Sequence, residues 1–242
     1  KEAGFDLLSL ANNHSNDFGA IGVNNTMKVL KKAEIQYAGL SSCPTAIFSC
    51  KNLKIGFAAF APNNGTVNIN DLKAAQKIVR GLDSVCDLVI VSFHGGAEGG
   101  TKNHITRETE NFLGENRGNP YKFARTVIDA GADIVFGHGP HVPRAVDMYK
   151  GRFIAYSMGN FATYGRFNLK TNSGYAPIID IYVNSKGEFM HGKIHSFVQL
   201  GEGGPVADAD KKVIKEISSL SKMDIPESPI EITSEGNIIK KP

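Results

Sequence analysis

The chain has 242 residues, a formal net charge of +3 and 41% hydrophobic residues. This length and composition are those of a globular protein, and the basic residues form no long run, so a nucleic-acid-binding protein is not expected. The longest apolar stretches, such as 55–61, are far shorter than the roughly 20 residues of a membrane-spanning helix, so no transmembrane segment is expected in this chain.

The first four residues, Lys1-Glu2-Ala3-Gly4, are typical of the last turn of a helix that leads into a strand. A native protein rarely starts inside a helix and without Met, so we expect the intact protein to have further N-terminal residues. Any targeting segment would lie among them. The three cysteines form no Cys-x-x-Cys motif and are expected to be free or structural thiols.

Short apolar strands and amphipathic helices alternate in the first half of the chain. Strands are predicted at 6–11, 45–49, 54–61, 88–92 and 133–136. Helices are predicted at 19–34, after the capping residue Asp71, and from Asn119-Pro120 to about Gly131. Between them, residues 95–118 are rich in Gly, Asn and Thr, and a loop of this length is more often functional than a plain linker.

Antiparallel strands dominate the second half. They are predicted at 145–149, 152–157, 178–183 and 189–198, with tight turns at Lys150-Gly151 and Ser185-Lys186-Gly187. A helix near 209–220 and a small hairpin around Glu235-Gly236 follow. This order favours an α/β sandwich with mixed sheets, in which 1–200 form one domain and 201–242 form an extension that packs on it.

Four of the apolar runs end in short polar clusters. These are Asn12-Asn13-His14, His94-Gly95-Gly96, Gly137-His138-Gly139-Pro140-His141 and Met158-Gly159-Asn160. Ligands gather beyond the carboxyl ends of parallel strands, and imidazoles and amide oxygens are good metal ligands. The pattern therefore predicts a convergent metal site, whereas His104, His191 and His195 are expected to be surface or core residues.

The same clusters, in order from about Phe5 to about Val198, closely resemble the bacterial capsule-synthesis CapA family, which includes poly-γ-glutamate biosynthesis proteins. The resemblance implies the calcineurin-like metallophosphoesterase fold, a four-layer α/β/β/α sandwich. By this likeness Asn13, His94, His138 and His141 would bind metal, and His14 would stabilise the transition state beside it.

The resemblance also implies two divalent metal ions, Mn, Fe or Zn, and acidic motifs that bridge them. Those motifs lie upstream of the first cluster seen here, and the predicted ligands are all neutral, although two dications repel strongly unless carboxylates bridge them. We therefore expect the intact protein to have about 50 to 100 further N-terminal residues, whose strands supply the remaining ligands. In the present chain the nearest carboxylates are Asp17 and Glu98.

The function expected from these residues is a phosphoesterase-like hydrolase of capsule or poly-γ-glutamate biosynthesis, located in the cell envelope according to the resemblance. Its anionic substrate is expected to contact Glu98, Arg144, Asn160 and Arg166. One alternative is a protein that binds or transfers an anionic polymer, with or without metal, and has no phosphatase activity. A more remote alternative is an interaction module that kept the fold and lost the metals. A serine hydrolase is not expected, because Tyr156-Ser157-Met158-Gly159 lacks the Gly-x-Ser-x-Gly motif.

Overall fold

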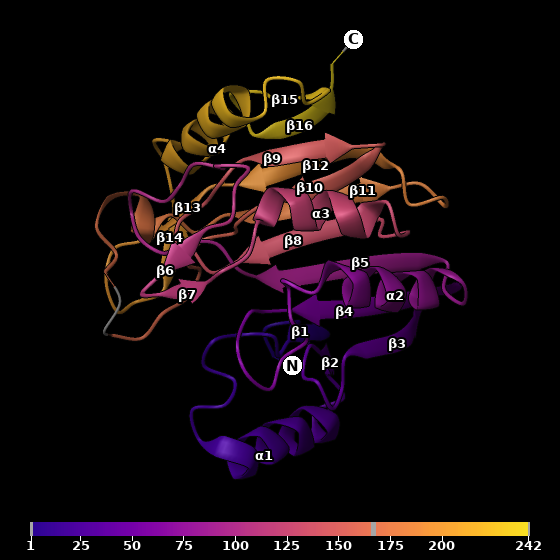
Figure 1. Ribbon diagram of the computed structural model, residues 1–242. Helices are drawn as coiled ribbons and strands as arrows, with labels where there is room; N and C mark the ends of the chain where they lie inside the picture. Colours follow the sequence, from indigo (N-terminus) through magenta and orange to yellow (C-terminus); the bar gives the residue numbers. More distant parts are fainter. Residues whose placement is uncertain (1, 166–167, 242) are drawn as a thin grey trace.

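The structure is a computed structural model, which describes residues 2–165 and 168–241 (Figure 1). Its helices are α1 (Gly19–Lys32), α2 (Leu72–Asp83), α3 (Pro120–Ile128), the 3₁₀ turn η1 (Thr171–Gly174) and α4 (Lys212–Asp224). The strands of the first half are β1 (Leu7–Ser9), β2 (Gln36–Ala38), β3 (Thr45–Cys50), β4 (Leu53–Phe60), β5 (Leu88–His94), β6 (Asn111–Phe112), β7 (Glu115–Asn116) and β8 (Ile134–His138). Those of the second half are β9 (Val146–Tyr149), β10 (Arg152–Ala155), β11 (Ile178–Val183), β12 (Phe189–His195), β13 (Phe197–Gln199), β14 (Pro205–Ala207), β15 (Ile230–Ile232) and β16 (Asn237–Lys240).

A six-stranded mixed sheet forms the centre of the molecule, in the order β3-β4-β5-β8-β10-β9. The four inner strands are parallel, and β3 and β9 pair antiparallel at the edges. Helices α2 and α3 pack against one face through residues such as Val79 and Phe123. Both helices begin as predicted, because the side chains of Asp71 and Asn119 accept hydrogen bonds from the first turn.

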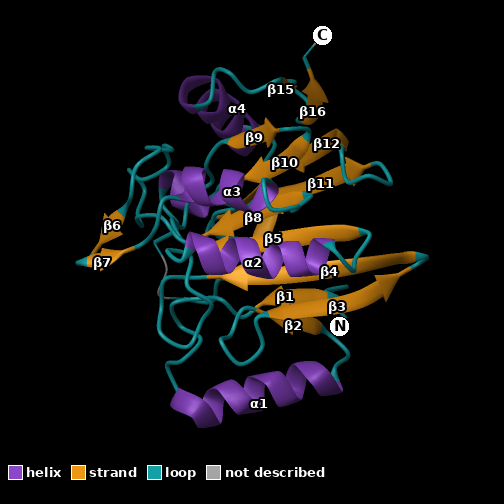
Figure 2. Cartoon of the chain, turned by 45° about the vertical axis from the view of Figure 1, so that its right-hand side comes forward, coloured by secondary structure: helices purple, strands orange, loops and turns teal. Residues whose placement is uncertain are grey.

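The opposite face of this sheet is covered by a second layer of strands. The parallel pair β1-β2 packs near β3 and β4 around Phe57 and Ala59. The four-stranded sheet β11-β12-β16-β15 packs with α4 near β9 and β10, around Phe153 and Phe189. Figures 1 and 2 show α1 outside β1 and β2, at the opposite end of the molecule from α4. The predicted α/β class with a central mixed sheet is confirmed.

Several predicted elements differ in detail from the observed ones. Strand β1 does not join the central sheet but pairs with β2, which the sequence pattern did not indicate. The single strand expected at 189–198 is two strands, since β12 pairs with β11 whereas β13 pairs with β14. The predicted hairpin at Glu235-Gly236 connects β15 and β16, and β16 pairs with β12, so the segment 201–242 adds strands to a sheet of the preceding chain.

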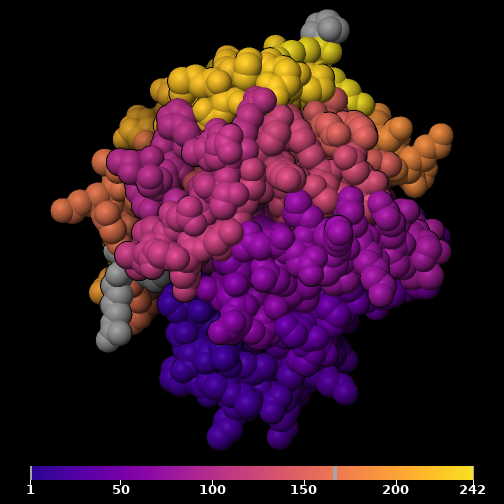
Figure 3. Space-filling view, in the orientation of Figure 1, coloured from indigo at the N-terminus to yellow at the C-terminus, as the bar shows by residue number. Residues whose placement is uncertain are grey.

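The C-terminal segment lies at the top of the molecule, and the chain begins below its centre, near β1 and β2 (Figure 1). In the space-filling view the indigo part of the chain, which includes α1, forms the bottom of the molecule (Figure 3). Cys43, Cys50 and Cys86 are free thiols, as expected. Within residues 2–165 and 168–241 no helix combines the length and the apolar character that a bilayer crossing requires.

Candidate functional site

His94 and His138 end two neighbouring parallel strands. In the register of β5 and β8 they are direct partners, so their side chains lie next to each other on one face of the sheet. Val91, Phe93 and Val135 alternate with them and pack under α2 and α3, which places the two imidazoles on the opposite face. The expectation that histidines from separate strands meet is therefore confirmed for this pair.

Both imidazoles are neutral at physiological pH. Burial lowers the pKa of His138 to about 4. Burial, followed by the positive charge of Arg117 and by the neighbouring His138, His141 and His14, lowers the pKa of His94 to about 3. Among the described residues no side chain makes a hydrogen bond to the His138 ring, which packs edge-on against Phe136 with ring centroids 5.7 Å apart. The His138 ring nitrogens are thus available to a ligand.

A close approach of two loops brings His141 to the same place. Gly139 has a φ of 124°, and a Cβ at this position would lie 2.6 Å from the carbonyl oxygen of Gly95, so a side chain would push the loops apart. His141 itself has a φ of 61°. Its Nδ1 lies 2.8 Å from Asn160 Oδ1, and its Nε2 lies 3.7 Å from Glu98 Oε2.

Asn160 is buried and holds His141 in position. Besides the contact with the imidazole, its amide nitrogen donates to the carbonyl oxygens of His141 (3.2 Å) and Ser173 (2.9 Å). Because the Asn160 oxygen accepts at Nδ1, that nitrogen carries a hydrogen, and the contact fixes the orientation of the ring. The arrangement supports a role for Asn160 in orienting His141. The predicted contact between Asn160 and substrate stays a prediction.

Arg117, which the sequence analysis did not single out, lies beside His94. Its Nη2 donates to His94 Nε2 (3.0 Å) and to Glu98 Oε1 (2.6 Å), and its Nη1 donates to Glu115 Oε2 (3.2 Å). The side chain is only 3% exposed. An arginine between Asn116 and Gly118, just ahead of a capped helix, is a weak sequence signal, and the contact depends on how the loop 95–118 folds.

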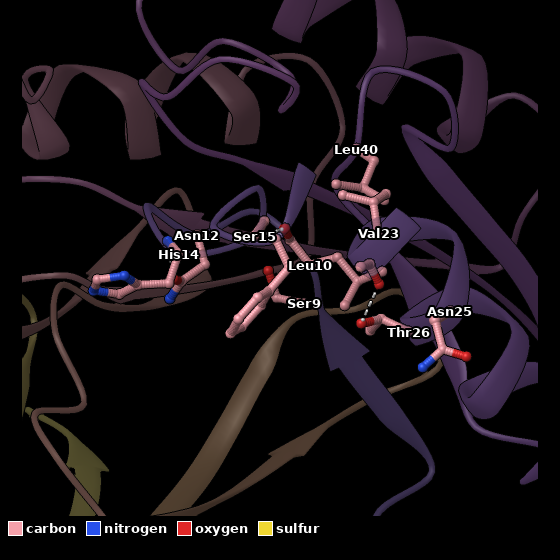
Figure 4. Close-up of a pocket in the computed structure, with 11 residues that line it drawn as sticks. Ser9, Leu10, Asn12, His14, Ser15, Val23, Asn25, Thr26 and Leu40 are labelled. Carbon is pink, nitrogen blue, oxygen red and sulfur yellow. Dashed lines mark hydrogen bonds between the residues drawn. The ribbon is translucent and has the colours of Figure 1, made fainter. Parts of the chain in front are cut away.

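The loop that follows β1 supplies the remaining residues. Asn12 Nδ2 lies 3.5 Å from His94 Nδ1, so this loop meets the end of β5 through Asn12, another residue that the sequence analysis did not name as a ligand. His14 Nδ1 lies 2.9 Å from Asp17 Oδ2, and His14 Nε2 lies 3.4 Å from Asn13 Nδ2. A pocket of about 560 Å³ extends from His14 and Asn12 along α1 to Thr26 (Figure 4). His14 is thus one of the residues that line this pocket.

Arg144 occupies a different environment from the one expected for an exposed anion-steering residue. It is fully buried, and it makes a two-pronged ion pair with Glu110 through both Nη atoms at 2.8 Å. Its Nε donates to Lys102 O (2.8 Å), and Nη2 also reaches Ala97 O (3.3 Å). Arg144 therefore anchors the loop 95–118 through Ala97, Lys102 and Glu110. Arg166, the other predicted anion contact, lies outside the described residues.

The predicted metal ligands have suitable donor atoms but are not arranged as a metal centre. Asn13, His94, His138 and His141 have suitable donor atoms, but His94 Nε2 already accepts a hydrogen bond from the Arg117 cation. Within residues 2–165 and 168–241 no three His, Cys, Asp or Glu side chains are grouped so as to hold a metal ion. In this arrangement the described residues do not fit a dinuclear centre, which would need additional carboxylates and a displaced Arg117.

Comparison with known proteins places these residues in a family. Residues 1–164 match the model of the family described as bacterial capsule synthesis protein PGA_cap. The chain is 29% identical over 228 residues to the capsule biosynthesis protein CapA of Bacillus anthracis, covering 86% of this chain and 52% of that protein. It is 28% identical over 177 residues to the PGA biosynthesis protein CapA of Bacillus subtilis, covering 66% of this chain and 43% of that protein. The chain thus spans about half the length of the curated relatives that it matches.

A solved structure of a hypothetical protein from Thermus thermophilus is similar with a TM-score of 0.45 and 18% identity. The matched region covers 85% of this chain and 75% of that one.

Proposed function

Since this chain belongs to the bacterial capsule synthesis family PGA_cap, we propose that its histidine cluster acts on an anionic substrate in the biosynthesis of a capsular or poly-γ-glutamate polymer. The observation that carries the proposal is the pairing of His94 with His138 at the ends of β5 and β8. Two neutral imidazoles side by side, one of them without a hydrogen-bond partner among the described residues, are suited to binding a ligand.

The reaction that we propose is a phosphoesterase-like hydrolysis that depends on divalent metal ions, Mn, Fe or Zn. When bound, such ions would polarise the substrate and activate water. Asn13, His94, His138 and His141 supply no carboxylate, so this proposal requires carboxylates beyond those four residues.

His14 has the best position to move a proton. Asp17 accepts from its Nδ1 at 2.9 Å, which orients the ring. His14 also lines the pocket along α1, and in the proposed role its Nε2 donates to a leaving oxygen or to its developing charge once substrate replaces the contact of that nitrogen with Asn13. Glu98, held on Arg117, lies beside the same cluster and fits a contact with substrate or metal.

A second candidate function is binding or transfer of the anionic polymer without hydrolysis. It is favoured by the contact of the Arg117 cation with His94, because a guanidinium at this position binds carboxylates as well as phosphoryl groups. In this case the histidines would be hydrogen-bonding partners of the polymer.

One set of assays separates the two candidates. Hydrolysis of phosphomonoesters and phosphodiesters is measured with Mn²⁺, with Zn²⁺ and after chelation, and binding of poly-γ-glutamate is measured by calorimetry. His138→Ala is the test variant. His191→Ala is the matched control, because His191 stacks on Tyr182 on β11, away from the histidine cluster.

Metal-dependent turnover that His138→Ala abolishes and His191→Ala retains supports the hydrolase. Polymer binding without turnover, sensitive to the same variant, supports binding or transfer. If the wild type neither hydrolyses nor binds, or if both variants behave alike, the histidine cluster is not the functional site.

A further inference from the structure

Two buried arginines belong to the environment of the loop 95–118, and they differ in how completely their N–H groups are bonded. Each of the three nitrogens of Arg144 donates a hydrogen bond, the two Nη atoms to Glu110 and Nε to Lys102 O. Arg117 is as deeply buried, but its Nε has no hydrogen-bond partner. The same loop thus provides an acceptor for every nitrogen of one arginine and leaves a nitrogen of the other without one.

The hydrogen bonds that Arg117 makes go to acceptors of different strength. One goes to the carboxylate of Glu98 (2.6 Å), and one reaches Glu115, whose side chain is 57% exposed. A third goes to His94 Nε2, a neutral acceptor. A guanidinium prefers the two oxygens of a carboxylate or phosphoryl group, which are stronger acceptors than an imidazole nitrogen. Arg117 thus keeps one N–H unbonded and another on a partner that an oxoanion would replace.

A second unbonded polar atom belongs to the strand that carries His94. The hydroxyl oxygen of Ser92, two residues before His94 on the same face of β5, is buried without a hydrogen-bond partner. A buried N–H or O–H that lacks a partner costs about 1 to 3 kcal/mol, and such groups are concentrated where a ligand or a water completes them. Both unbonded groups adjoin His94, on which the proposed site is built.

We propose that Arg117 is a substrate-binding residue that takes an oxoanion, a carboxylate or a phosphoryl group, at the site formed by His94 and His138. This inference rests on the proposed anionic substrate and adds the group that recognises it. Glu98 then acts as a positioning residue, since its ion pair holds the guanidinium at His94 and prevents it from swinging out to solvent.

The test measures binding of two probes, inorganic phosphate and a γ-linked glutamate tetrapeptide, by calorimetry. The variants are Arg117→Gln and Arg117→Lys, and Arg107→Gln is the matched control. Arg107 is an arginine of the same loop that pairs with Glu227 on the surface. We expect Arg117→Gln to raise the dissociation constant of the probe that binds by about tenfold or more, and Arg117→Lys to raise it less. Arg107→Gln should change this constant by less than about twofold.

A measurement on the wild-type chain keeps the test valid if Arg117→Gln does not fold. The ¹⁵N signal of the Arg117 Nε–H group, assigned through its loss in Arg117→Lys, should shift and saturate as the probe is added. The probe that causes the shift identifies the source of the oxoanion, phosphoryl or carboxylate.

The inference is overturned if the wild type binds neither probe, if the Nε–H signal stays in place while a probe binds, or if Arg117→Gln binds as tightly as the wild type. These results leave the proposed function standing wherever His138→Ala still abolishes turnover or polymer binding. Loss of that His138 effect, with a responsive Arg117, contradicts the proposed function instead.

Discussion

The site joins two regions that are built very differently. The first region, the ends of β5 and β8 with α2 and α3 behind them, carries His94 and His138 on a densely packed core. The second, residues 7–32 with β1 and α1, carries Asn13 and His14. Helix α1 buries none of its residues, and Phe18 and Ile21 are each 87% exposed.

This difference shows how rigidity is distributed around the site. Elements with few buried apolar contacts open locally at low free energy, whereas packed core elements open only with global unfolding. The imidazole pair of the first region is therefore fixed, and the His14 region is the part able to adjust to a substrate.

Replacing a phenylalanine should be severe in the first region and mild in the second. Phe123 is completely buried and contacts Phe60 and Phe93, so Phe123→Ala should lower the free energy of unfolding by about 3 to 5 kcal/mol. Phe18→Ala should change it by less than about 0.5 kcal/mol. Urea unfolding measures both, and equal losses would show that α1 is packed in solution.

Arg144→Gln should lower the free energy of unfolding by about 3 kcal/mol or more, because it leaves the carboxylate of Glu110 buried without its partner. The matched control is Lys150→Gln, which breaks an exposed pair with Asp129 and should hardly move the unfolding midpoint. Hydrogen exchange should show faster exchange in 95–118 for the Arg144 variant. Unchanged exchange there would contradict the anchoring role.

His14→Ala should reduce turnover of a hydrolysed phosphoester about a hundredfold or more, as expected for the loss of a general acid. Metal content and thermal stability should stay close to those of the wild type, since His14 is exposed and its partner Asp17 belongs to the same loop. Steady-state kinetics and elemental analysis measure the two effects. Equal loss of turnover and of metal would assign His14 to metal binding instead.

Asp17→Asn should have the smallest effect on stability, because its contact with His14 is largely exposed to solvent. The catalytic effect should be modest but specific. With an amide in place of the carboxylate, the His14 ring loses the charged acceptor that orients it, so turnover should fall while substrate binding stays the same. Steady-state kinetics measure both quantities, and turnover equal to that of the wild type would exclude a role for Asp17 in holding His14.

Local patterns in the sequence were sufficient for most helices and strands. Asp71 and Asn119 cap helices as expected, since a capping side chain bonds within its own first turn. Strand β2 was missed because its three residues are too short to show a period, and β1 pairs with it rather than with the central sheet. Arg144, an expected anion contact, instead lies in the core, because its ion-pair partner comes from a loop 34 residues away in sequence.

By itself, the sequence determined that apolar strands end in histidine-rich clusters, because alternation, turn residues and caps act between near neighbours along the chain. The residues that contact those clusters are seen only in the tertiary structure. Asn12 reaches His94 across 82 residues, and Arg117 reaches it across 23, through a loop with no regular period. Such contacts depend on loop closure and on the burial of charge, which no local pattern records, and they determine the hydrogen-bonding partners of His94.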